Sequence, residues 1–388
     1  METADVVIVG GGIMGWCTAY NLLAGGFRGR VVVIERDHLR RRTSTCLAVG
    51  GFRQQFGTEI NIRIVRRSVS FYENFADLME TPDGRPDISL RQRGYLFLAS
   101  EKTWPVFQRR HQLQTRLGVE VTLLTAQQAR ELVPELDLDG VVGAAFCPRD
   151  GYLDPYAVLQ GFEAKARHLG AECKYEEAVA IERDGAGVKS VRTTVSSIAT
   201  RTLVNAAGAW AGELARLAGV EVPVRPWRRQ VYVCRLPPAV GRDFPMVVDV
   251  TGVHFRSETG GLIVVGGTTA SDTDTFDAIW DRSPFVDEIW PVLASRVPCF
   301  DTLRLENGWA GLYDENPIDH NAIIGCHPEL PGFYLINGFS GHGLMQGPAA
   351  GRGLAELVMW GEYRTVDLSP LSLSRFAAGK LIVEEAVI

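Results

Sequence analysis

The chain has 388 residues, of which 46% are hydrophobic, enough to fill two domains of ordinary size. Its formal net charge of -6 comes from interspersed acidic and basic residues, which argues against nucleic acid or an anionic membrane as a partner. No charged leader precedes the first strand and no apolar run approaches the roughly 20 residues of a membrane span, so we expect a cytoplasmic protein that binds small molecules.

The first 35 residues have the pattern of a strand, a turn, a helix and a second strand. Asp5–Val9 predicts a short buried strand, Ile13–Ala24 has helical spacing, and Val31–Ile34 predicts another buried strand. This succession within about 30 residues is typical of the opening of a doubly wound sheet.

A glycine motif and an acidic residue point to a dinucleotide. Gly10, Gly12 and Gly15 form G-x-G-x-x-G between strand and helix, where the backbone can approach a pyrophosphate at the helix N-terminus. Glu35 follows 20 residues after Gly15, where a carboxylate can accept hydrogen bonds from both ribose hydroxyls. An acidic residue here disfavours a 2′-phosphate, but motif and acid together do not distinguish FAD from NAD.

The middle of the chain leaves the α/β pattern and returns to it. A helical pattern over Thr58–Met79 precedes the turn-rich "TPDGRPD" and a strand candidate at Tyr95–Leu98. The α/β pattern resumes with a predicted helix at Pro155–His168, for which Asp154 is the N-cap. Two predicted strands follow, at Glu172–Tyr175 and Leu203–Ala206.

Longer alternating strands dominate Val222–Gly311, with one helix near Pro284–Arg296, as expected for a mostly antiparallel sheet. The tail alternates again, with a strand at Phe333–Ile336, the glycine-rich "GFSGHG" and a helix from about His342 to Met359. The predicted fold is therefore α/β, with a Rossmann-like dinucleotide-binding domain interleaved with an α+β substrate domain built on a mostly antiparallel sheet.

Two later segments favour FAD over NAD. "TLVNAAGAWAGELA" is a buried strand ending in small residues that can lie against a planar or phosphate group, although an ordinary strand-to-helix turn is the alternative. "GFSGHGLMQG" is a second glycine-rich turn about 320 residues after the first, which a single nicotinamide dinucleotide does not obviously need.

In this order, "VVIVGGGIMG" with Glu35, "VNAAGAWA" and "GFSGHGLMQGPAAGRGLAELV" resemble the FAD-dependent amino-acid and amine oxidoreductases that include sarcosine oxidase, glycine oxidase and D-amino-acid oxidase. "GGFRQQFGTEINIRIVRRSV", "RGYLFL" and "RDGYLDPYA" are similar to the L-proline dehydrogenase β subunit branch and to a mitochondrial FAD-dependent oxidoreductase-domain protein. We expect an FAD-binding domain from 1–84, 145–220 and 317–388, and a substrate-binding domain from 85–144 and 221–316.

The resemblance implies which positions hold FAD. The ADP half would contact Gly10, Gly12, Ile13, Met14, Gly15, Glu35, Arg36 and Val179. The pyrophosphate and the flavin side would be closed by Thr43, Ser44, Ala207, Gly208 and Trp210. The pyrimidine end of the flavin would lie on Gly338, Phe339, Ser340, Gly341, His342, Gly343 and Leu344, where a helix N-terminus can stabilise negative charge.

Three departures from sarcosine oxidase bear on function. That oxidase holds its flavin through a cysteine shortly before a tyrosine matching Tyr313, whereas Gly311 and Leu312 stand here, so we expect noncovalent FAD. Its oxygen-activating lysine has no counterpart in "GGLIVVGG", where Ile263 is near that position, which disfavours fast oxidase activity. Met345 replaces a carboxylate-binding lysine, a change shared with the proline dehydrogenase branch.

Four residues are candidates for the reaction site. Arg53 offers a bidentate grip on a carboxylate, or else pairs structurally within its helix junction. Tyr313 matches a family tyrosine near the substrate, and His254 lies on a strand that lines the family's pocket, although a core aromatic and a framework histidine are the alternatives. His342 is expected at the flavin, with an electrostatic or positioning role rather than that of a general base.

Several other residues have simpler interpretations. Cys46 is expected to pack as a small buried side chain, and Arg40, Arg41 and Arg42 to be solvated. Ser340 lacks the G-x-S-x-G elbow of a hydrolase nucleophile. The seven cysteines are scattered without a C-x-x-C pair, which predicts reduced thiols and no metal site.

The predicted function is oxidation of the C–N bond of a small secondary or N-substituted amino acid, which is sarcosine-, proline-, glycine- or iminodiacetate-like. Hydride would pass to flavin N5, the imine would then hydrolyse, and oxygen or another acceptor would reoxidise the flavin. The alternative is a flavoprotein subunit or assembly factor that needs a partner or an oligomer and has little activity alone. NAD-dependent dehydrogenation is disfavoured.

Overall fold

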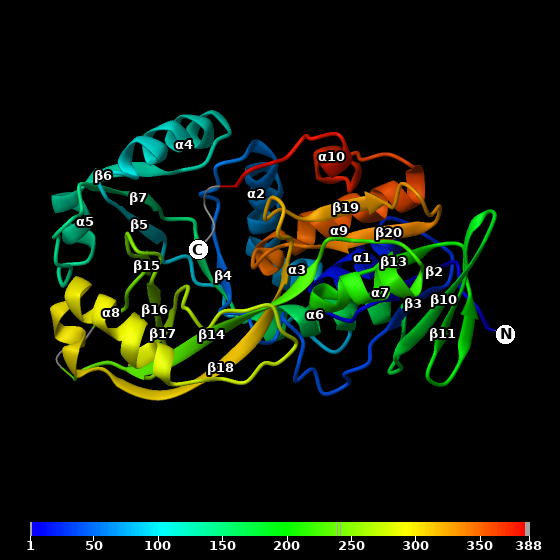
Figure 1. Cartoon of the computed structure of the whole chain (residues 1–388), viewed down its shortest axis with the longest axis horizontal. Helices are drawn as coiled ribbons and strands as arrows, with labels where there is room; N and C mark the ends of the chain where they lie inside the picture. Colours follow the sequence, from blue (N-terminus) through cyan, green and yellow to red (C-terminus); the bar gives the residue numbers. More distant parts are fainter. Residues whose placement is uncertain (1, 239, 241, 385–388) are drawn as a thin grey trace.

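The computed structural model describes residues 2–238, 240 and 242–384, in which two sheets lie side by side (Figure 1). The six-stranded sheet has the order β19-β20-β13-β2-β3-β9 and is parallel except for the antiparallel pair β19 and β20. Its strands are β2 Val6–Val9, β3 Val31–Ile34, β9 Glu172–Lys174, β13 Leu203–Asn205, β19 Ile323–Cys326 and β20 Phe333–Asn337.

This sheet is covered on both faces, as its uninterrupted apolar strands require. Val6 and Ile8 face a core of helices, whereas Val7 and Val9 face a second core with a small four-stranded sheet and a helix. The helices of the first core are α1 Ile13–Ala24, α2 Glu59–Glu73, α6 Pro155–His168 and α9 Gly343–Trp360. The second core contains α7 Ala211–Leu217 and the strands β1 Glu2–Thr3, β10 Ala178–Asp184, β11 Gly187–Thr193 and β12 Ser197–Ala199.

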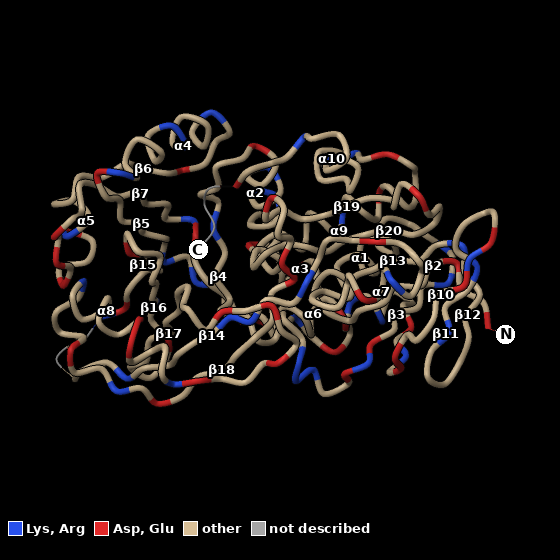
Figure 2. Tube along the Cα trace, viewed as in Figure 1, with Lys and Arg blue, Asp and Glu red and all other residues tan. Residues whose placement is uncertain are grey.

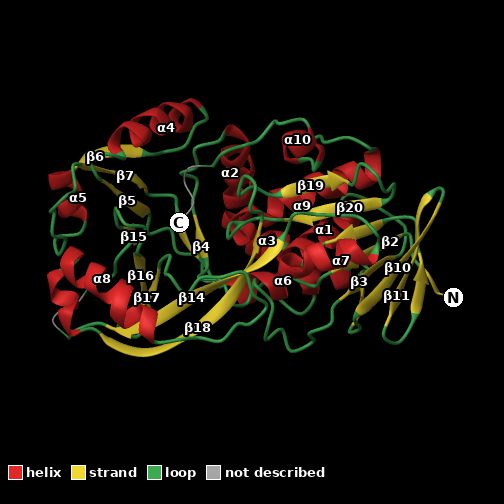
Figure 3. Cartoon of the chain, viewed as in Figure 1, coloured by secondary structure: helices red, strands yellow, loops and turns green. Residues whose placement is uncertain are grey.

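The eight-stranded sheet has the order β18-β14-β17-β16-β15-β5-β7-β6 and is antiparallel except between β15 and β5. Its strands are β5 Tyr95–Ala99, β6 Thr122–Thr125, β7 Gly143–Cys147, β14 Arg225–Arg235, β15 Met246–Val248, β16 His254–Glu258, β17 Leu262–Gly266 and β18 Arg304–Glu315. The helices α5 Ala126–Leu132 and α8 Trp290–Arg296 cover one face (Figure 3). The opposite face is turned toward the first sheet.

Shorter elements complete the chain. They are β4 Gly51–Phe52, α3 Phe75–Leu78, α4 Trp104–Arg116, β8 Gly151–Tyr152, the 3₁₀ turns Gly208–Trp210, Pro298–Thr302 and Ser369–Leu371, the π-helical turn Phe285–Ile289, and α10 Ser374–Ala377. Basic and acidic residues are interspersed along the whole trace (Figure 2). In the described part of the chain, no helix is long and apolar enough to cross a membrane.

The predicted fold class is confirmed. The strand Val31–Ile34 and the helix Ile13–Ala24 have the bounds that the sequence predicts, and Asp154 caps α6 by accepting from the N–H groups of Tyr156 and Ala157. The predicted helix Thr58–Met79 is wrong as a single element, because it is interrupted at Asn74, whose backbone departs from helical angles. The domain boundaries stay a prediction. Strands of the six-stranded sheet all fall within 1–84, 145–220 and 317–388.

Candidate active site

One large cavity of about 790 Å³ lies between the two sheets. Its first wall is formed where β2, β3, β13 and β20 end, at the carboxyl edge of parallel strands where open α/β sheets bind ligands. Its second wall comes from β5, β14, β15, β16 and β18 of the other sheet. All the candidate residues predicted from the sequence line this cavity except Gly15 and Gly338.

The glycine motif allows backbone to meet backbone. Gly10 has a φ of 115°, and a Cβ there would lie 2.2 Å from the carbonyl oxygen of Ala206. A Cβ on Gly15 would lie 1.9 Å from the carbonyl oxygen of Gly10, so this glycine permits α1 to pack against the turn without facing the cavity. The structure therefore gives Gly15 a packing role, and its contact with the cofactor stays a prediction.

Glu35 is held in place at the adenosine end of the cavity. Its carboxylate accepts hydrogen bonds from the N–H groups of Gly11 and Asp37, both at 2.7 Å. A fixed carboxylate at the end of β3 suits the two hydroxyls of an adenosine ribose. Val179 on β10 is 39% exposed and lines the same end of the cavity.

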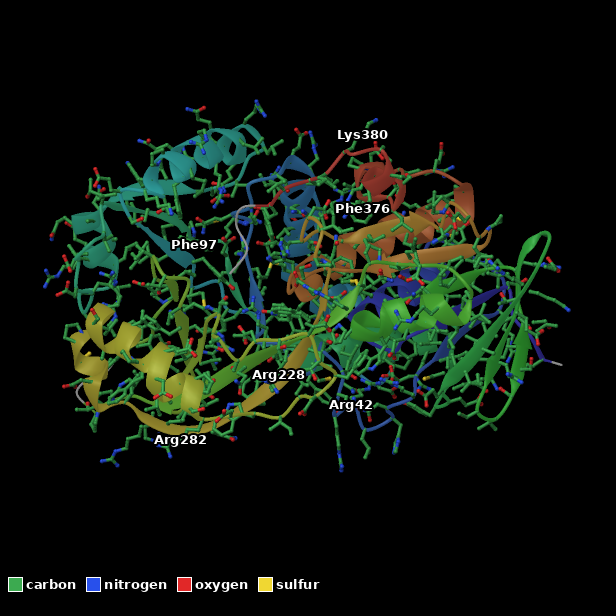
Figure 4. The ribbon with its side chains drawn as sticks, in the orientation of Figure 1. Arg42, Phe97, Arg228, Arg282, Phe376 and Lys380 are labelled. Carbon is green, nitrogen blue, oxygen red and sulfur yellow. The ribbon has the colours of Figure 1, made fainter. Side chains whose placement is uncertain are left out.

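Of the three arginines predicted to be solvated, Arg41 and Arg42 are exposed as expected, and Arg40 is not. Arg40 is only 9% exposed at its side chain and forms an ion pair with Glu163 of α6. Arg36 and Arg42 both lie over the ring of Trp210, with their Cζ atoms 4.2 and 5.3 Å from its centroid, and both line the cavity. Figure 4 labels Arg42 on its loop below the first sheet.

Thr45 is a site residue that sequence reasoning missed. Its Oγ1 accepts a hydrogen bond from the N–H of Ile13 at 3.1 Å, next to the predicted pair Thr43 and Ser44. It thereby satisfies one N–H group in the first turn of α1, which helps fix that turn at the cavity. On the opposite side, Gly208 has a φ of 55°, and a Cβ added to it would meet no atom within 4 Å, so space remains open there.

The glycines of the second glycine-rich turn, Gly338–Gly343, have different structural roles. A Cβ on Gly341 would lie 2.4 Å from the ring of Tyr313, so this glycine makes room for that ring. Gly338, with a φ of 72°, packs against Val224 and Asn316 rather than lining the cavity. Ser340 is 2% exposed, and its Oγ accepts from the N–H of Asn316 at 3.1 Å, which is a structural role.

Asp314 was also missed, and it joins this turn to β18. Its Oδ2 accepts from the N–H of Phe339 and its carbonyl oxygen accepts from the N–H of Ser340, both at 3.1 Å. Burial raises the pKa of the Asp314 carboxyl to about 7. The only feature of the sequence that could have indicated Asp314 is its position directly after the candidate Tyr313.

At the other end of the cavity, Arg53 and His342 contact each other across 289 residues. The Arg53 side chain is 1% exposed, its Nη1 donates to the carbonyl oxygen of Gln55 at 2.9 Å, and its Nη2 lies 3.1 Å from His342 Nε2. A guanidinium has only donors, so His342 Nε2 accepts and Nδ1 carries the proton. Burial lowers the pKa of His342 well below its usual range, which keeps the imidazole neutral.

A buried carboxylate fixes the segment that follows Arg53. Asp150 is fully buried and accepts from the N–H of Gln54 at 2.8 Å and from Gln55 Nε2 at 3.1 Å. Burial raises the pKa of Asp150 to about 6. The polar run "RQQ" between apolar residues in the sequence is explained by this buried partner.

His254, Tyr313 and Arg229 form the wall opposite the turn. His254 Nδ1 donates to the carbonyl oxygen of Gly252 at 3.2 Å, and burial lowers the pKa of this histidine to about 4, so it is neutral near pH 7. Arg229 was missed by sequence reasoning; its Nη1 donates to Asp272 at 2.5 Å, and its Cζ lies 5.5 Å from the ring of Tyr313.

The residues at which the chain departs from sarcosine oxidase differ in whether they line the cavity. Gly311, Leu312 and Met345 line the cavity, as expected. Ile263 does not, because alternation along β17 turns it into the core behind the sheet while Gly266 faces the cavity. Cys46 packs against the core of the first sheet, and burial raises the pKa of its thiol to about 11.

A family model described as FAD dependent oxidoreductase matches residues 5–357. The chain belongs to this family. The predicted resemblance, FAD as cofactor and the oxidoreductase class are thereby confirmed. In the described part of the chain, no group of three or more His, Cys, Asp or Glu side chains is arranged to hold a metal ion.

Three similar proteins illustrate the family's range. The chain is 36% identical over 425 residues to FAD-dependent oxidoreductase domain-containing protein 1 of Xenopus laevis, an alignment that covers 100% of this chain and 85% of that protein. It is 28% identical over 376 residues to mitochondrial sarcosine dehydrogenase of Mus musculus, covering 93% of this chain and 40% of that longer protein. The crystal structure of L-proline dehydrogenase from P. horikoshii matches with a TM-score of 0.89 at 31% identity, covering 98% and 100% of the two chains.

Proposed function

We propose that this FAD-dependent oxidoreductase oxidises the C–N bond of a small secondary or N-substituted amino acid. The observation that carries the proposal is the Arg53 guanidinium, buried at the end of the cavity opposite the dinucleotide motif and hydrogen-bonded to a neutral histidine. A desolvated guanidinium is the side chain best suited to a two-point grip on a carboxylate.

The substrate class follows from this cation and from the similar proteins. Two of the similar proteins are named for their action on sarcosine and on proline. Both compounds are secondary amines that carry a carboxylate on the adjacent carbon. Glycine- and iminodiacetate-like compounds present the same carboxylate next to an amine. We therefore propose a substrate of this general form, in which Arg53 holds the carboxylate and the amine carbon faces the flavin.

The residues of the cavity fit FAD along its whole length. Gly10, Gly12 and Glu35 would hold the ADP half, and the turn Phe339–Gly343 at the N-terminus of α9 would lie under the flavin. We propose noncovalent binding, because Gly311 and Leu312 occupy the place of the linking cysteine.

Bound FAD would supply the two-electron oxidation of the substrate C–N bond by taking up a hydride at N5, and water would hydrolyse the resulting imine. This chain contributes alignment and exclusion of water. Arg53 fixes the carboxylate end of the substrate, His342 keeps Arg53 oriented without adding charge, and Tyr313 and His254 form the wall over the reacting carbon.

We propose an electron acceptor other than oxygen as the principal one. The cations among the described cavity-lining residues are arginines, and no lysine is among them. The scattered free cysteines are in keeping with a reducing compartment, and the cytosol is the proposed one.

The test is anaerobic reduction of the purified yellow protein by a panel of N-substituted amino acids. Sarcosine, L-proline or a close analogue is expected to bleach the flavin absorbance near about 450 nm, as reduced flavin lacks that band. Esters of the same compounds should fail, because they lack the carboxylate that Arg53 would bind. Bleaching only after a second subunit is added would instead support the flavoprotein-subunit alternative, and a colourless protein that takes up no FAD would refute both.

A further inference from the structure

The described part of the C-terminal segment, through Glu384, reaches the turn that follows Arg53. From Lys380, labelled in Figure 4, the chain leaves α10 and runs back to α2 between the two sheets (Figures 1 and 4). It is fixed on the way, since the N–H of Ile382 donates to Asp319 at 3.2 Å and the carbonyl oxygen of Ile382 accepts from Asn321 Nδ2 at 2.6 Å.

Glu384 closes this connection through hydrogen bonds at the start of α2. The side chain is 4% exposed, and Oε1 accepts from the N–H of Gly57 at 2.8 Å. Oε2 accepts from the N–H of Thr58 at 3.2 Å, from Thr58 Oγ1 at 2.9 Å and from Asn61 Nδ2 at 3.1 Å. Thr58 is the N-cap residue of α2 and makes no capping bond with its own side chain. Glu384 therefore supplies the acceptor and the negative charge that the first turn of α2 needs.

Phe56 links this cap to the reaction site. Its carbonyl oxygen accepts from Gln114 Nε2 of α4 at 2.9 Å, and Gly57 follows it directly, so its backbone is held from both sides. Its ring lies 4.2 Å from the Arg53 guanidinium carbon and meets the His342 ring edge-on, with the centroids 4.9 Å apart. The backbone that Glu384 holds at Gly57 and Thr58 is therefore continuous with the residue whose ring contacts both Arg53 and His342.

We propose that Glu384 is a positioning residue for the Arg53–His342 pair, so that the C-terminal segment forms part of the substrate-binding apparatus. The inference rests on the proposed role of Arg53 as carboxylate anchor. Glu384 acts through the turn Phe56–Thr58 and touches neither substrate nor flavin. The negative charge of Glu384 acts separately from this positioning: it counteracts the lowering of the Arg53 pKa by burial, and it would repel a substrate carboxylate held at Arg53.

The chain offers a closely matched control in Glu356. That side chain is also buried, and it accepts from the N–H groups of Arg364 and Thr365 and from Thr365 Oγ1, as Glu384 accepts from two N–H groups and a threonine hydroxyl; Glu356 additionally pairs with Arg352 at 2.8 Å. Glu356 lies on α9 away from the cavity lining. Glu384→Ala and Glu356→Ala should lower thermal stability by comparable amounts, whereas only Glu384→Ala should alter the substrate site.

The readout is binding of 2-tetrahydrofuroate, a proline analogue whose ring oxygen replaces the amine, measured by the change in the flavin spectrum of the FAD-loaded protein. Glu384→Ala should raise its Kd by about 10-fold, since a carboxylate anchor held about 1.4 kcal/mol less well loses one decade of affinity. FAD content should stay at the wild-type level. With an oxidisable substrate, KM should rise by a similar factor while kcat changes less.

Glu384→Gln removes the negative charge and keeps one of the two acceptor oxygens, so it retains part of the hydrogen bonding to Gly57, Thr58 and Asn61 that Glu384→Ala loses entirely. An increase in Kd smaller than about 3-fold supports positioning. Equal Kd values for Glu384→Ala, Glu356→Ala and wild type would overturn the inference. Tighter binding of the carboxylate by both Glu384 variants would also overturn it, because the change in affinity would then come from the lost negative charge. If the wild-type protein binds no carboxylate at all, the proposed function is wrong. If the wild-type protein binds the carboxylate and Glu384→Ala binds it equally well, only the inference about Glu384 is wrong.

Discussion

The two ends of the cavity depend on different kinds of contact, namely close backbone packing at one end and buried polar side chains at the other. The dinucleotide end depends on close backbone packing, because Gly10 and Gly15 allow contacts that any Cβ would block. The end proposed to bind substrate has the buried polar side chains of Arg53 and His342 in its lining, with Asp150 behind them, and the three come from distant parts of the chain. The first end tolerates almost no change of residue type, whereas the second depends on the relative positions of charges and should respond by degrees.

The largest expected effect is at the glycine end. Gly15→Ala puts a methyl group 1.9 Å from the Gly10 carbonyl oxygen, so α1 must move and FAD should be lost or the fold disrupted. The FAD content of the purified protein measures this. Gly185→Ala is the control, because a Cβ there meets no atom within 4 Å, and it should remain yellow. A yellow Gly15→Ala protein with normal FAD content would contradict the account of this end.

Arg53→Lys should show the graded response of the substrate end. Lysine keeps the charge but loses the planar two-point grip and the hydrogen bond to His342, so KM for a carboxylate substrate should rise by about 100-fold. FAD content should be unchanged. Arg228→Lys is the control on β14, because Arg228 lies outside the cavity lining and donates to the carbonyl oxygen of Ser271. Equal KM values for the two variants would exclude Arg53 as the anchor.

Glu35→Ala tests whether the two ends are independent. Removing the carboxylate that is predicted to bind the ribose should raise the Kd for FAD by about 10-fold, because hydrogen bonds to charged groups contribute roughly 1.5–3 kcal/mol. With saturating FAD, KM for the amino acid should match the wild type, the reverse of the result for Arg53→Lys. Titration of apoprotein with FAD, followed by flavin fluorescence, gives the first quantity. A KM that changed along with the FAD affinity would mean that the ends are coupled.

Asp314→Asn should give the smallest effect, visible as a pH dependence of stability. Burial raises the pKa of Asp314 from 3.8 to about 7, so the native state holds this proton more tightly than the unfolded state. The stability from the protonated carboxyl is therefore present below about pH 4 and is lost as pH rises through about 7. The Tm of wild-type apoprotein minus that of Asp314→Asn should fall by a few degrees, about 2–4 °C per kcal/mol, between about pH 5 and pH 8. Parallel Tm curves would show that Asp314 does not titrate in this range.

Much of the dinucleotide end was predictable because its determinants are local. Buried strands, helical spacing and the three glycines fall within 35 residues, and steric limits on the backbone allow few interpretations of such a pattern. Arg53, Tyr313, His254 and His342, which family resemblance put forward as candidates, all line one cavity, and their roles in the reaction stay predictions. It misplaced Ile263, because the register of β17 decides which face each residue takes.

The sequence by itself determined the α/β class, the dinucleotide turn and the residue types available for catalysis, because these depend on periodicity and on steric rules that act between near neighbours. Only the tertiary structure decided the pairing of Arg53 with His342, the attachment of Asp314 to the second glycine turn and the cap that Glu384 places on α2. Gly341 illustrates the difference: its freedom suggests a cofactor, yet the ring of Tyr313 is what fills the space. Contacts between residues hundreds of positions apart are specified by packing and charge in the folded chain, and no local pattern records them.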